Sequence, residues 1–177
     1  MTGGILLCGA NGSGKTTLGK ELSKALHHKY IDVEDYSFLE SQVPYSKPRP
    51  RDQVRLSILR DIEKYRYFIL SAVNGDMGNE INAMYRCVIY LSAPLALRLK
   101  RIRQRSYEEF RERVQIGGDM YDQEQRFLAF VAARSMEKTD MWIQTLSCPV
   151  IYADGTRDIQ EHVKWLLSNY AAILEKR

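Results

Sequence analysis

A glycine-rich segment near the N-terminus carries the residues best suited to chemistry. Residues 9–16 read Gly-Ala-Asn-Gly-Ser-Gly-Lys-Thr and match the pattern G-x-x-x-x-G-K-[ST] without a departure. Glycines at these positions let successive backbone N–H groups point at phosphate oxygens, and the N-terminus of a following helix adds a favourable dipole. The Lys15 ammonium would reach the β- and γ-phosphates, and the Thr16 hydroxyl would ligate Mg²⁺. The residues expected to contact the nucleotide are Gly9, Asn11, Gly12, Ser13, Gly14, Lys15, Thr16 and Thr17.

The glycine-rich segment could also be a turn that only joins a strand to a helix, but such a turn needs neither the lysine nor the threonine. Other parts of the sequence must decide the fate of the γ-phosphate. No Asn-Lys-x-Asp motif of a GTPase and no Leu-Ser-Gly-Gly-Gln signature of a transporter ATPase occurs. The apolar run 68–73 is followed by Asn74-Gly75-Asp76 and not by the Asp-Glu of a large hydrolytic ATPase. A small kinase is the class that remains.

Acidic residues follow the second apolar run, at Asp32, Glu34 and Asp35. Residues just past the carboxyl end of a parallel strand beside the phosphate-binding strand face the ligand cleft in α/β sheets, which makes these three catalytic candidates. The alternative is an ordinary polar loop that caps the next helix. Asp76, after the third run, has two equal interpretations, a turn residue or a ligand of metal-bound water.

Arginines form a second candidate group, because a phosphoryl group in transfer carries charge that fixed cations stabilise. Arg98, Arg101 and Arg105 would share one helix face at i, i+3 and i+7. The stretch 98–113 holds six arginines together with Lys100. A solvated helix face is the alternative for any one of them.

The elements that must position these residues follow from hydrophobic periodicity. Short apolar runs alternate with stretches of helical period, which is typical of βα units on a parallel sheet. We expect a single three-layer α/β domain over residues 1–177, with a five-stranded, mostly parallel sheet. The segments 41–52 and 106–121 do not fit the alternation and are expected to be loops, the first because it contains three prolines. The expected strands are 5–8, 30–33, 67–73, 87–91 and 150–153.

With these motifs in place, the chain resembles the P-loop small-molecule kinases, the superfamily of nucleoside monophosphate kinases and shikimate kinases. The resemblance covers nearly the whole chain, and only its P-loop is specific by itself. It implies a phosphotransferase that uses ATP and Mg²⁺, in which the acidic cluster holds metal-bound water, through Asp32, and orients or deprotonates the acceptor hydroxyl. Shikimate kinases carry Asp-x-Asp, whereas this chain has Asp32-Val33-Glu34 followed by Asp35.

The resemblance also implies roles for residues outside the P-loop. Arg101 would stack on the adenine, Arg105 would approach the phosphates, and Asp154 and Gly155 would touch the adenine through backbone contacts. A lid would span about 106–121, with Arg126 and Arg134 as weaker candidates for closing over the donor. An acceptor-binding segment would span about 36–65. The candidate acceptor residues are Tyr36, Arg49, Arg51, Gly75 and Asp76, although the basic residues here could equally lie in a surface loop and Tyr36 could belong to the core.

Composition sets the remaining expectations. The chain has 177 residues, 45% of them hydrophobic, and a formal net charge of +4 without a block of five basic residues, so nucleic acid is not an expected partner. Cys8, Cys87 and Cys148 have neither disulfide nor zinc spacing. No apolar run approaches the roughly 18 residues of a membrane span, and a cytoplasmic monomer or homodimer acting on a small-molecule acceptor is expected. A nucleotide-dependent regulatory ATPase that acts on a protein partner, and a polynucleotide-end kinase, stay open as alternatives.

Overall fold

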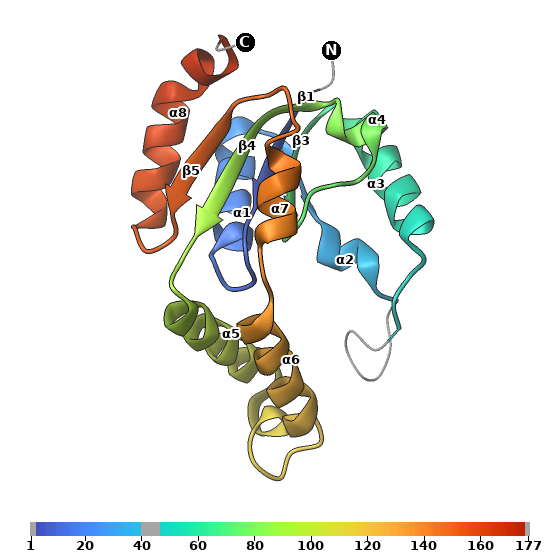
Figure 1. Ribbon diagram of the computed structural model, residues 1–177, viewed down its shortest axis with the longest axis vertical. Coiled ribbons are helices and arrows are strands. Elements are labelled where there is room, and N and C mark those ends of the chain that lie inside the picture. Colours follow the sequence, from blue (N-terminus) through green and yellow to red (C-terminus); the bar gives the residue numbers. More distant parts are fainter. Residues whose placement is uncertain (1–2, 40–46, 176–177) are drawn as a thin grey trace.

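The computed structural model describes residues 3–39 and 47–175, and these form a sheet covered on both faces by helices (Figure 1). All pairings within the sheet are parallel, and the strand order is β2-β3-β1-β4-β5. The expected three-layer α/β fold is therefore confirmed, and each strand lies within two residues of its expected bounds at both ends. The strands are β1 (Gly3–Cys8), β2 (Lys29–Asp32), β3 (Tyr67–Ala72), β4 (Tyr85–Ser92) and β5 (Val150–Asp154).

Helices α1 and α8 cover one face of the sheet, and α3, α4 and α7 cover the other. The layers follow from the apolar stripes of the helices, because each stripe must be buried against the continuous apolar strands. The helices are α1 (Lys15–Leu26), α2 (Val33–Ser37), α3 (Arg51–Tyr65), α4 (Asn79–Asn82), α5 (Leu95–Phe110), α6 (Tyr121–Ala133), α7 (Glu137–Ile143) and α8 (Ile159–Glu175), with a 3₁₀ turn η1 (Arg111–Val114).

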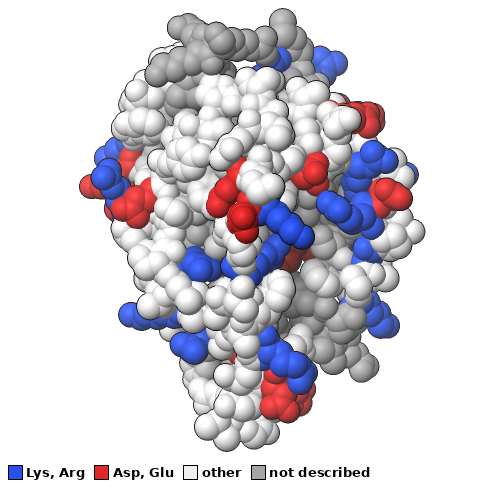
Figure 2. Space-filling view, viewed as in Figure 1, with Lys and Arg blue, Asp and Glu red and all other residues white. Residues whose placement is uncertain are grey.

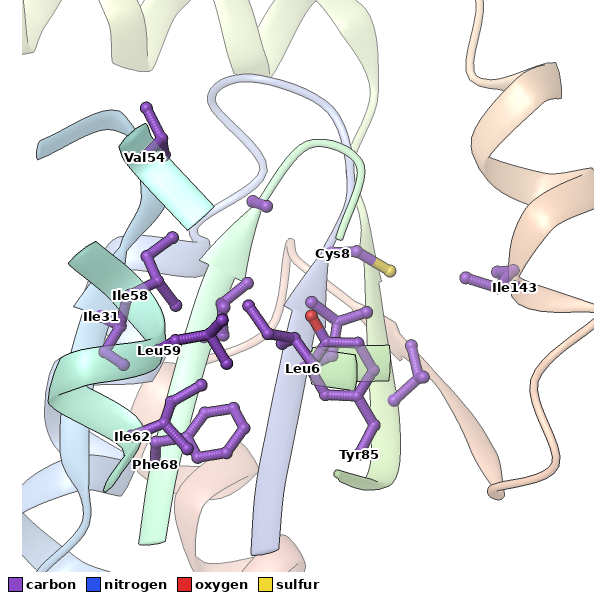
Figure 3. Close-up of a cluster of buried hydrophobic side chains, with 14 residues drawn as sticks. Leu6, Cys8, Ile31, Val54, Ile58, Leu59, Ile62, Phe68, Tyr85 and Ile143 are labelled. Atoms are coloured by element: carbon purple, nitrogen blue, oxygen red, sulfur yellow. The ribbon is translucent and has the colours of Figure 1, made fainter. Parts of the chain in front are cut away.

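The larger core cluster lies between the sheet and helices α3 and α7 (Figure 3). Phe68 of β3 and Tyr85 of β4 are buried there with ring centroids 6.3 Å apart, and Ile143 of α7 points toward the strands. A Cβ at Gly4 would lie 2.2 Å from the Phe68 ring, so the glycine makes room for that ring. Each fully buried apolar side chain contributes about 1.5–3 kcal/mol to stability. This cluster therefore holds β1, β3 and β4 together with the helices α3 and α7.

The two segments expected to be loops are more regular than the sequence suggested. Residues 40–46 lie outside the described residues, so half of the 41–52 prediction is not tested. Arg51 and Asp52 nevertheless form the first turn of α3, because Pro50 stands at its N-cap position with the φ that a helix start accepts. Before it, Leu39 N–H donates to the Lys47 carbonyl at 2.9 Å and Arg49 N–H donates to the Ser37 carbonyl at 2.8 Å.

The expectation of a loop over 106–121 is wrong for much of that segment. Helix α5 continues to Phe110, η1 follows, and α6 begins at Tyr121, so only the turn between η1 and α6 is irregular. Ile102 of α5 packs against Leu128 and Val131 of α6 in a small core of its own. That apolar contact stabilises the two helices, although the polar composition of residues 106–121 had indicated a loop. Together α5 and α6 form a helical hairpin that extends from the end of β4, away from the sheet (Figure 1).

Candidate active site

The segment Gly9–Gly14 forms a compact loop between β1 and α1. Gly9, Gly12 and Gly14 have φ values of 141°, 79° and 110°, which side-chain-bearing residues rarely adopt. A Cβ at Gly9 would lie 2.2 Å from the Leu91 carbonyl oxygen, and one at Gly12 would lie 2.5 Å from the Arg98 carbonyl oxygen. The glycines are therefore required twice, by their own backbone conformation and by the close approach of β4 and α5.

The interior of this loop has the features of an anion cradle. The Ser13 hydroxyl is fully buried and has no hydrogen-bond partner among the described residues. The Lys15 ammonium donates to the Ala10 carbonyl at 3.0 Å, so it lies across the loop. Burial lowers the pKa of Lys15 to about 8, although the nearby Asp32 and Glu34 carboxylates oppose that change. A buried hydroxyl without a partner and an ammonium that donates to a neutral carbonyl fit a site for a bound polyphosphate.

Asp32, at the end of β2, accepts three hydrogen bonds. Its Oδ2 accepts from the Thr16 hydroxyl at 3.2 Å and from the Tyr30 hydroxyl at 3.0 Å. Its Oδ1 accepts from the Glu34 backbone N–H at 3.2 Å, which caps α2. The capping alternative and the active-site alternative for Asp32 are therefore both compatible with its position.

The Thr16 and Asp32 oxygens form a donor set that suits Mg²⁺. This ion prefers oxygen ligands, keeps several waters, and is commonly bound by one or two protein side chains together with substrate phosphates. Among residues 3–39 and 47–175, no group of three or more His, Cys, Asp or Glu side chains is arranged to hold a metal by itself. A site that depends on nucleotide phosphates fits this chain better than a closed protein cage.

The structure separates the two acidic residues that follow Asp32. Glu34 is half-buried, and burial raises its pKa, while the charges of Arg105 and Lys15 lower it. Asp35 is more exposed; desolvation and the Asp32 charge raise its pKa, and the cation that opposes this change is Lys20 of α1. Of these two carboxylates, Glu34 is thus the one grouped with the P-loop lysine and with an arginine of α5.

Two arginines of α5 contact the backbone of the P-loop, and Arg134, just after α6, contacts a P-loop side chain. Arg101 donates to the Ser13 carbonyl at 3.2 Å and to the Gly155 carbonyl at 2.9 Å. Arg98 donates to the Asn11 carbonyl at 3.3 Å, and the exposed Arg134 reaches the Asn11 side-chain oxygen at 3.4 Å. Arg105 is exposed.

The loop after β5 packs directly on the P-loop. Gly155 is buried, donates its N–H to the Ser92 carbonyl at 2.6 Å, and would place a Cβ 2.5 Å from the Ser13 carbonyl oxygen. The Asp154 carboxylate instead accepts from the backbone and hydroxyl of Thr156, at 2.9 and 2.8 Å, and so closes its own turn. Thr17 is exposed at the start of α1.

On the far side of β1, the loop after β3 is held by its own polar groups. The Asp76 carboxylate accepts from the Gly78 N–H at 3.2 Å and from the Asn82 amide at 2.8 Å. The Gly75 carbonyl accepts from the Tyr85 hydroxyl at 2.8 Å, and a Cβ at Gly75 would lie 2.4 Å from the Leu6 side chain. Of the two interpretations of Asp76, these contacts favour the turn residue.

The remaining acceptor candidates lie on and before α3. The Tyr36 hydroxyl donates to Asp61 of α3, and its ring packs against the larger core cluster, which favours the core interpretation. Arg51 donates to the Asp76 carbonyl at 3.3 Å. The Arg49 Nε is buried and lacks a hydrogen-bond partner among the described residues.

Two residues were missed by the sequence analysis. Arg55 is half-buried, its Nε has no partner among the described residues, and its guanidinium lies 3.6 Å from where a Gly78 Cβ would stand. The i, i+4 spacing of Arg51 and Arg55 was a signal that could have found it. Tyr30 lies within a predicted strand, and no sequence pattern indicated that its hydroxyl would reach Asp32.

Taken together, the sheet order, the positive-φ glycines of the loop after β1, and the Lys15–Thr16–Asp32 group define a nucleotide-binding P-loop protein of the kinase type. A family model described as an AAA domain matches residues 5–126, more than half of the chain, and the chain belongs to that family.

Similar proteins extend this assignment. The chain is 29% identical over 175 residues to the uncharacterized protein YqaC of Bacillus subtilis (strain 168), covering 94% of this chain and 97% of that protein. It is 26% identical over 109 residues to a shikimate kinase of Thermosynechococcus vestitus (strain NIES-2133 / IAM M-273 / BP-1), covering 56% of this chain and 60% of that enzyme. The resemblance to P-loop small-molecule kinases is therefore confirmed, and the chain is a P-loop kinase.

Solved structures agree on the fold. A shikimate kinase from Bacteroides thetaiotaomicron superposes with a TM-score of 0.60 at 19% identity, over 97% of this chain and 99% of that one. A gluconokinase from Sinorhizobium meliloti 1021 superposes with a TM-score of 0.56 at 13% identity, over 98% and 94%. Among the described residues, no helix is both long and apolar enough to span a membrane.

Proposed function

We propose that this chain transfers the γ-phosphoryl group of MgATP to a hydroxyl of a small acceptor that carries an anionic group. The observation that carries the proposal is the grouping of Lys15, Thr16, Asp32 and Glu34 at the carboxyl ends of β1 and β2. Phosphoryl transfer needs little covalent chemistry from the protein and depends on positioning and on charge neutralisation. Each of these residues supplies one of those two effects.

Donor binding begins with the P-loop. Its backbone N–H groups and the N-terminus of α1 receive the phosphates, and Lys15 leaves the Ala10 carbonyl to contact them. Thr16 and Asp32 would hold Mg²⁺, which supplies neutralisation of the phosphate charge when it is bound. Arg101 positions Gly155 against the P-loop, so the purine would lie against the backbone of the loop after β5.

Transfer joins the acceptor oxygen to the γ-phosphorus and breaks the bond from that phosphorus to the β,γ-bridging oxygen. The acceptor proton then needs a base. Glu34 is suited to take it, because burial raises the pKa of this carboxyl, although the positive charges of Arg105 and Lys15 lower it, and a raised pKa makes a carboxylate a stronger base. Arg105 would stabilise the charge that develops on the phosphoryl oxygens.

The acceptor would bind between α3 and the loop after β3. Arg49 and Arg55 each have a buried Nε without a partner among the described residues, and a buried charged group of this kind normally finds one. A carboxylate or phosphate on the acceptor would supply the missing hydrogen-bond partner, since such a group can accept two hydrogen bonds from one guanidinium. Two relatives by sequence or fold are named for acceptors with a carboxylate, shikimate kinase and gluconokinase, which supports an acidic polyol over a neutral sugar or nucleoside.

The hairpin of α5 and α6 would act as a lid over the donor. Its turn is closed by an ion pair in which Arg113 contacts Asp119 at 2.8 Å. Exclusion of water by such a lid limits hydrolysis. Replacing residues 111–119 with a short turn should therefore raise ADP release without acceptor relative to transfer, and an unchanged ratio would remove the hairpin from the mechanism.

The direct test measures ADP formation from MgATP against a panel of acceptors, with a no-acceptor control. The panel holds hydroxy acids such as shikimate and gluconate, nucleoside monophosphates, nucleosides and neutral sugars. One acidic acceptor should raise turnover well above the control and yield a phosphorylated product. Equal ADP release with every acceptor would contradict the proposal and favour the regulatory ATPase.

A matched pair of variants tests the acceptor site. Arg55→Ala should raise the KM for the acidic acceptor while leaving the KM for ATP unchanged. Arg60→Ala, which removes an exposed arginine of the same helix, should leave both unchanged. If Arg55→Ala behaves like Arg60→Ala, Arg55 does not bind the acceptor.

The polynucleotide-end kinase is less well supported. On the face viewed in Figure 2, basic side chains gather across the middle, but acidic side chains lie directly beside them. Polynucleotide binding would be recognised by a steep fall in affinity as salt is raised.

A further inference from the structure

A single carboxylate oxygen of Asp32 receives two hydroxyl donors from different elements. Thr16, in the first turn of α1, donates to Oδ2 at 3.2 Å, and Tyr30 of β2 donates to the same atom at 3.0 Å. Tyr30 and Asp32 are two residues apart in one strand, so both side chains lie on the same face of the sheet. Ser71 of the neighbouring strand β3 is buried and pairs with Asp32 in the parallel register, so it lies beside these hydroxyls and not in solvent.

The ring of Tyr30 packs against helix α1 at Gly19. Gly19 lies three residues after Thr16 and so shares its helix face. A Cβ at Gly19 would lie 2.3 Å from the Tyr30 Cε2, which means that the ring occupies the space of the missing side chain. Because glycine inside a helix costs stability, this position is explained by the ring that packs there.

The Tyr30 hydroxyl donates in this contact, because a carboxylate oxygen offers lone pairs and no proton. Tyr30 and Thr16 therefore both orient the same oxygen of Asp32.

We infer that Tyr30 is a positioning residue for the metal ion that accompanies ATP, acting through Asp32 on Thr16. A threonine hydroxyl can offer a lone pair to a cation while its proton points elsewhere. Asp32 Oδ2 accepts the hydrogen bond of that hydroxyl, and Tyr30 fixes Oδ2 so that the free lone pairs of Thr16 keep one direction. The inference rests on the proposed function, because it requires that the bound nucleotide carries Mg²⁺.

Calorimetric titration with ATP, in Mg²⁺ and in EDTA, tests this without any acceptor or turnover. In the wild-type protein Mg²⁺ should strengthen ATP binding. In Tyr30→Phe the affinity in EDTA should stay at the wild-type value, whereas the gain on adding Mg²⁺ should shrink by about tenfold or more, the range typical for residues that orient metal ligands. Tyr170→Phe, which removes a half-buried hydroxyl of α8 that lies 3.5 Å from His28, is the matched control and should keep the full gain.

The other outcomes overturn the inference in distinguishable ways. If Tyr30→Phe keeps the wild-type gain, Tyr30 has no role at the metal site while the proposed function stands. An equal loss of affinity in Mg²⁺ and in EDTA would show that the ring only supports the P-loop. If Mg²⁺ does not strengthen ATP binding even in the wild-type protein, the metal part of the proposed function fails together with this inference.

Discussion

The guanidinium of Arg101 donates a hydrogen bond of 2.9 Å to the carbonyl oxygen of Gly155, and so joins α5 to the loop after β5. The same side chain also reaches the Ser13 carbonyl at 3.2 Å. Both acceptors are backbone atoms of loops that a nucleotide would contact. The stacking of Arg101 on adenine, which the resemblance to related kinases implies, stays a prediction, and the hydrogen bonds of Arg101 join the P-loop to the loop after β5.

Removing this connection should weaken both stability and nucleotide binding. Arg101→Ala loses two hydrogen bonds from a charged donor, and we expect the free energy of unfolding to fall by about 1.5–3 kcal/mol, measured by denaturant titration. The Kd for ATP should rise because Gly155 and Ser13 are no longer held together. The exposed Arg103 of the same helix is the control, and Arg103→Ala should change neither value. Wild-type affinity in Arg101→Ala would speak against the connection.

Adjacent carboxylates should differ in their effect on turnover. Glu34→Gln removes the proposed base and should lower kcat by about 10²-fold or more, with little change in the Kd for ATP. Asp35→Asn should remain close to wild type, because Asp35 is exposed and lies in the field of Lys20. Steady-state kinetics with the best acceptor provides the comparison. Equal effects of the two substitutions would exclude Glu34 as the base.

Nucleotide affinity should depend on the protonation of Lys15. Burial lowers its pKa from 10.5 to about 8, so in the free protein the ammonium becomes neutral above about pH 8. Phosphates require the charged form, and ATP affinity should fall by up to about tenfold per pH unit above that value. Between pH 8 and 10.5 the unfolded chain binds more protons at this site than the folded chain, so this group makes the free energy of unfolding rise with pH there.

Calorimetry at several pH values, in buffers of different ionisation heat, should also detect proton uptake when ATP binds above pH 8. Lys15→Arg serves as the control, because a guanidinium keeps its charge over this range. The pH dependence should flatten in that variant. A slope equal to that of the wild type would assign it to another group.

Gly19→Ala should destabilise the protein, although alanine normally stabilises a helix interior by about 0.5–1 kcal/mol. The added Cβ would meet the Tyr30 ring at 2.3 Å. Overpacking of this kind costs about 1–3 kcal/mol, which outweighs the gain in helix propensity. In a Tyr30→Ala background the same substitution should cost clearly less, because only the contact with the Leu7 side chain at 2.9 Å remains, and a double-mutant cycle by thermal unfolding measures the difference. Stabilisation in both backgrounds would show that the ring does not depend on Gly19.

Much of the fold and the donor site could be predicted from the sequence, because both depend on local signals. The continuous apolar strands and the spacing of Gly9, Gly14 and Lys15 can each be recognised within a few consecutive residues of the sequence. The end of α5 and the turn η1, which lie within 106–121, were mistaken for a loop, since the contact of Ile102 with Leu128 that supports the hairpin joins residues that no local pattern relates. Tyr30 was missed because its ring packs against Gly19 of another element, α1, whereas the i, i+4 spacing of Arg51 and Arg55 was a local signal that had not been used.

The strand order divides the site between two parts of the chain. β1 is central, with β4 and β5 on one side and β3 and β2 on the other. The residues assigned to the acceptor lie on α3 and the loop after β3, whereas Arg101 and Gly155 lie beyond β4. During divergence, the segment from α3 to α4 could change its substrate preference by substitution or exchange while the nucleotide half remained intact. Such inheritance in separate blocks would give related chains a common phosphoryl donor and different acceptors.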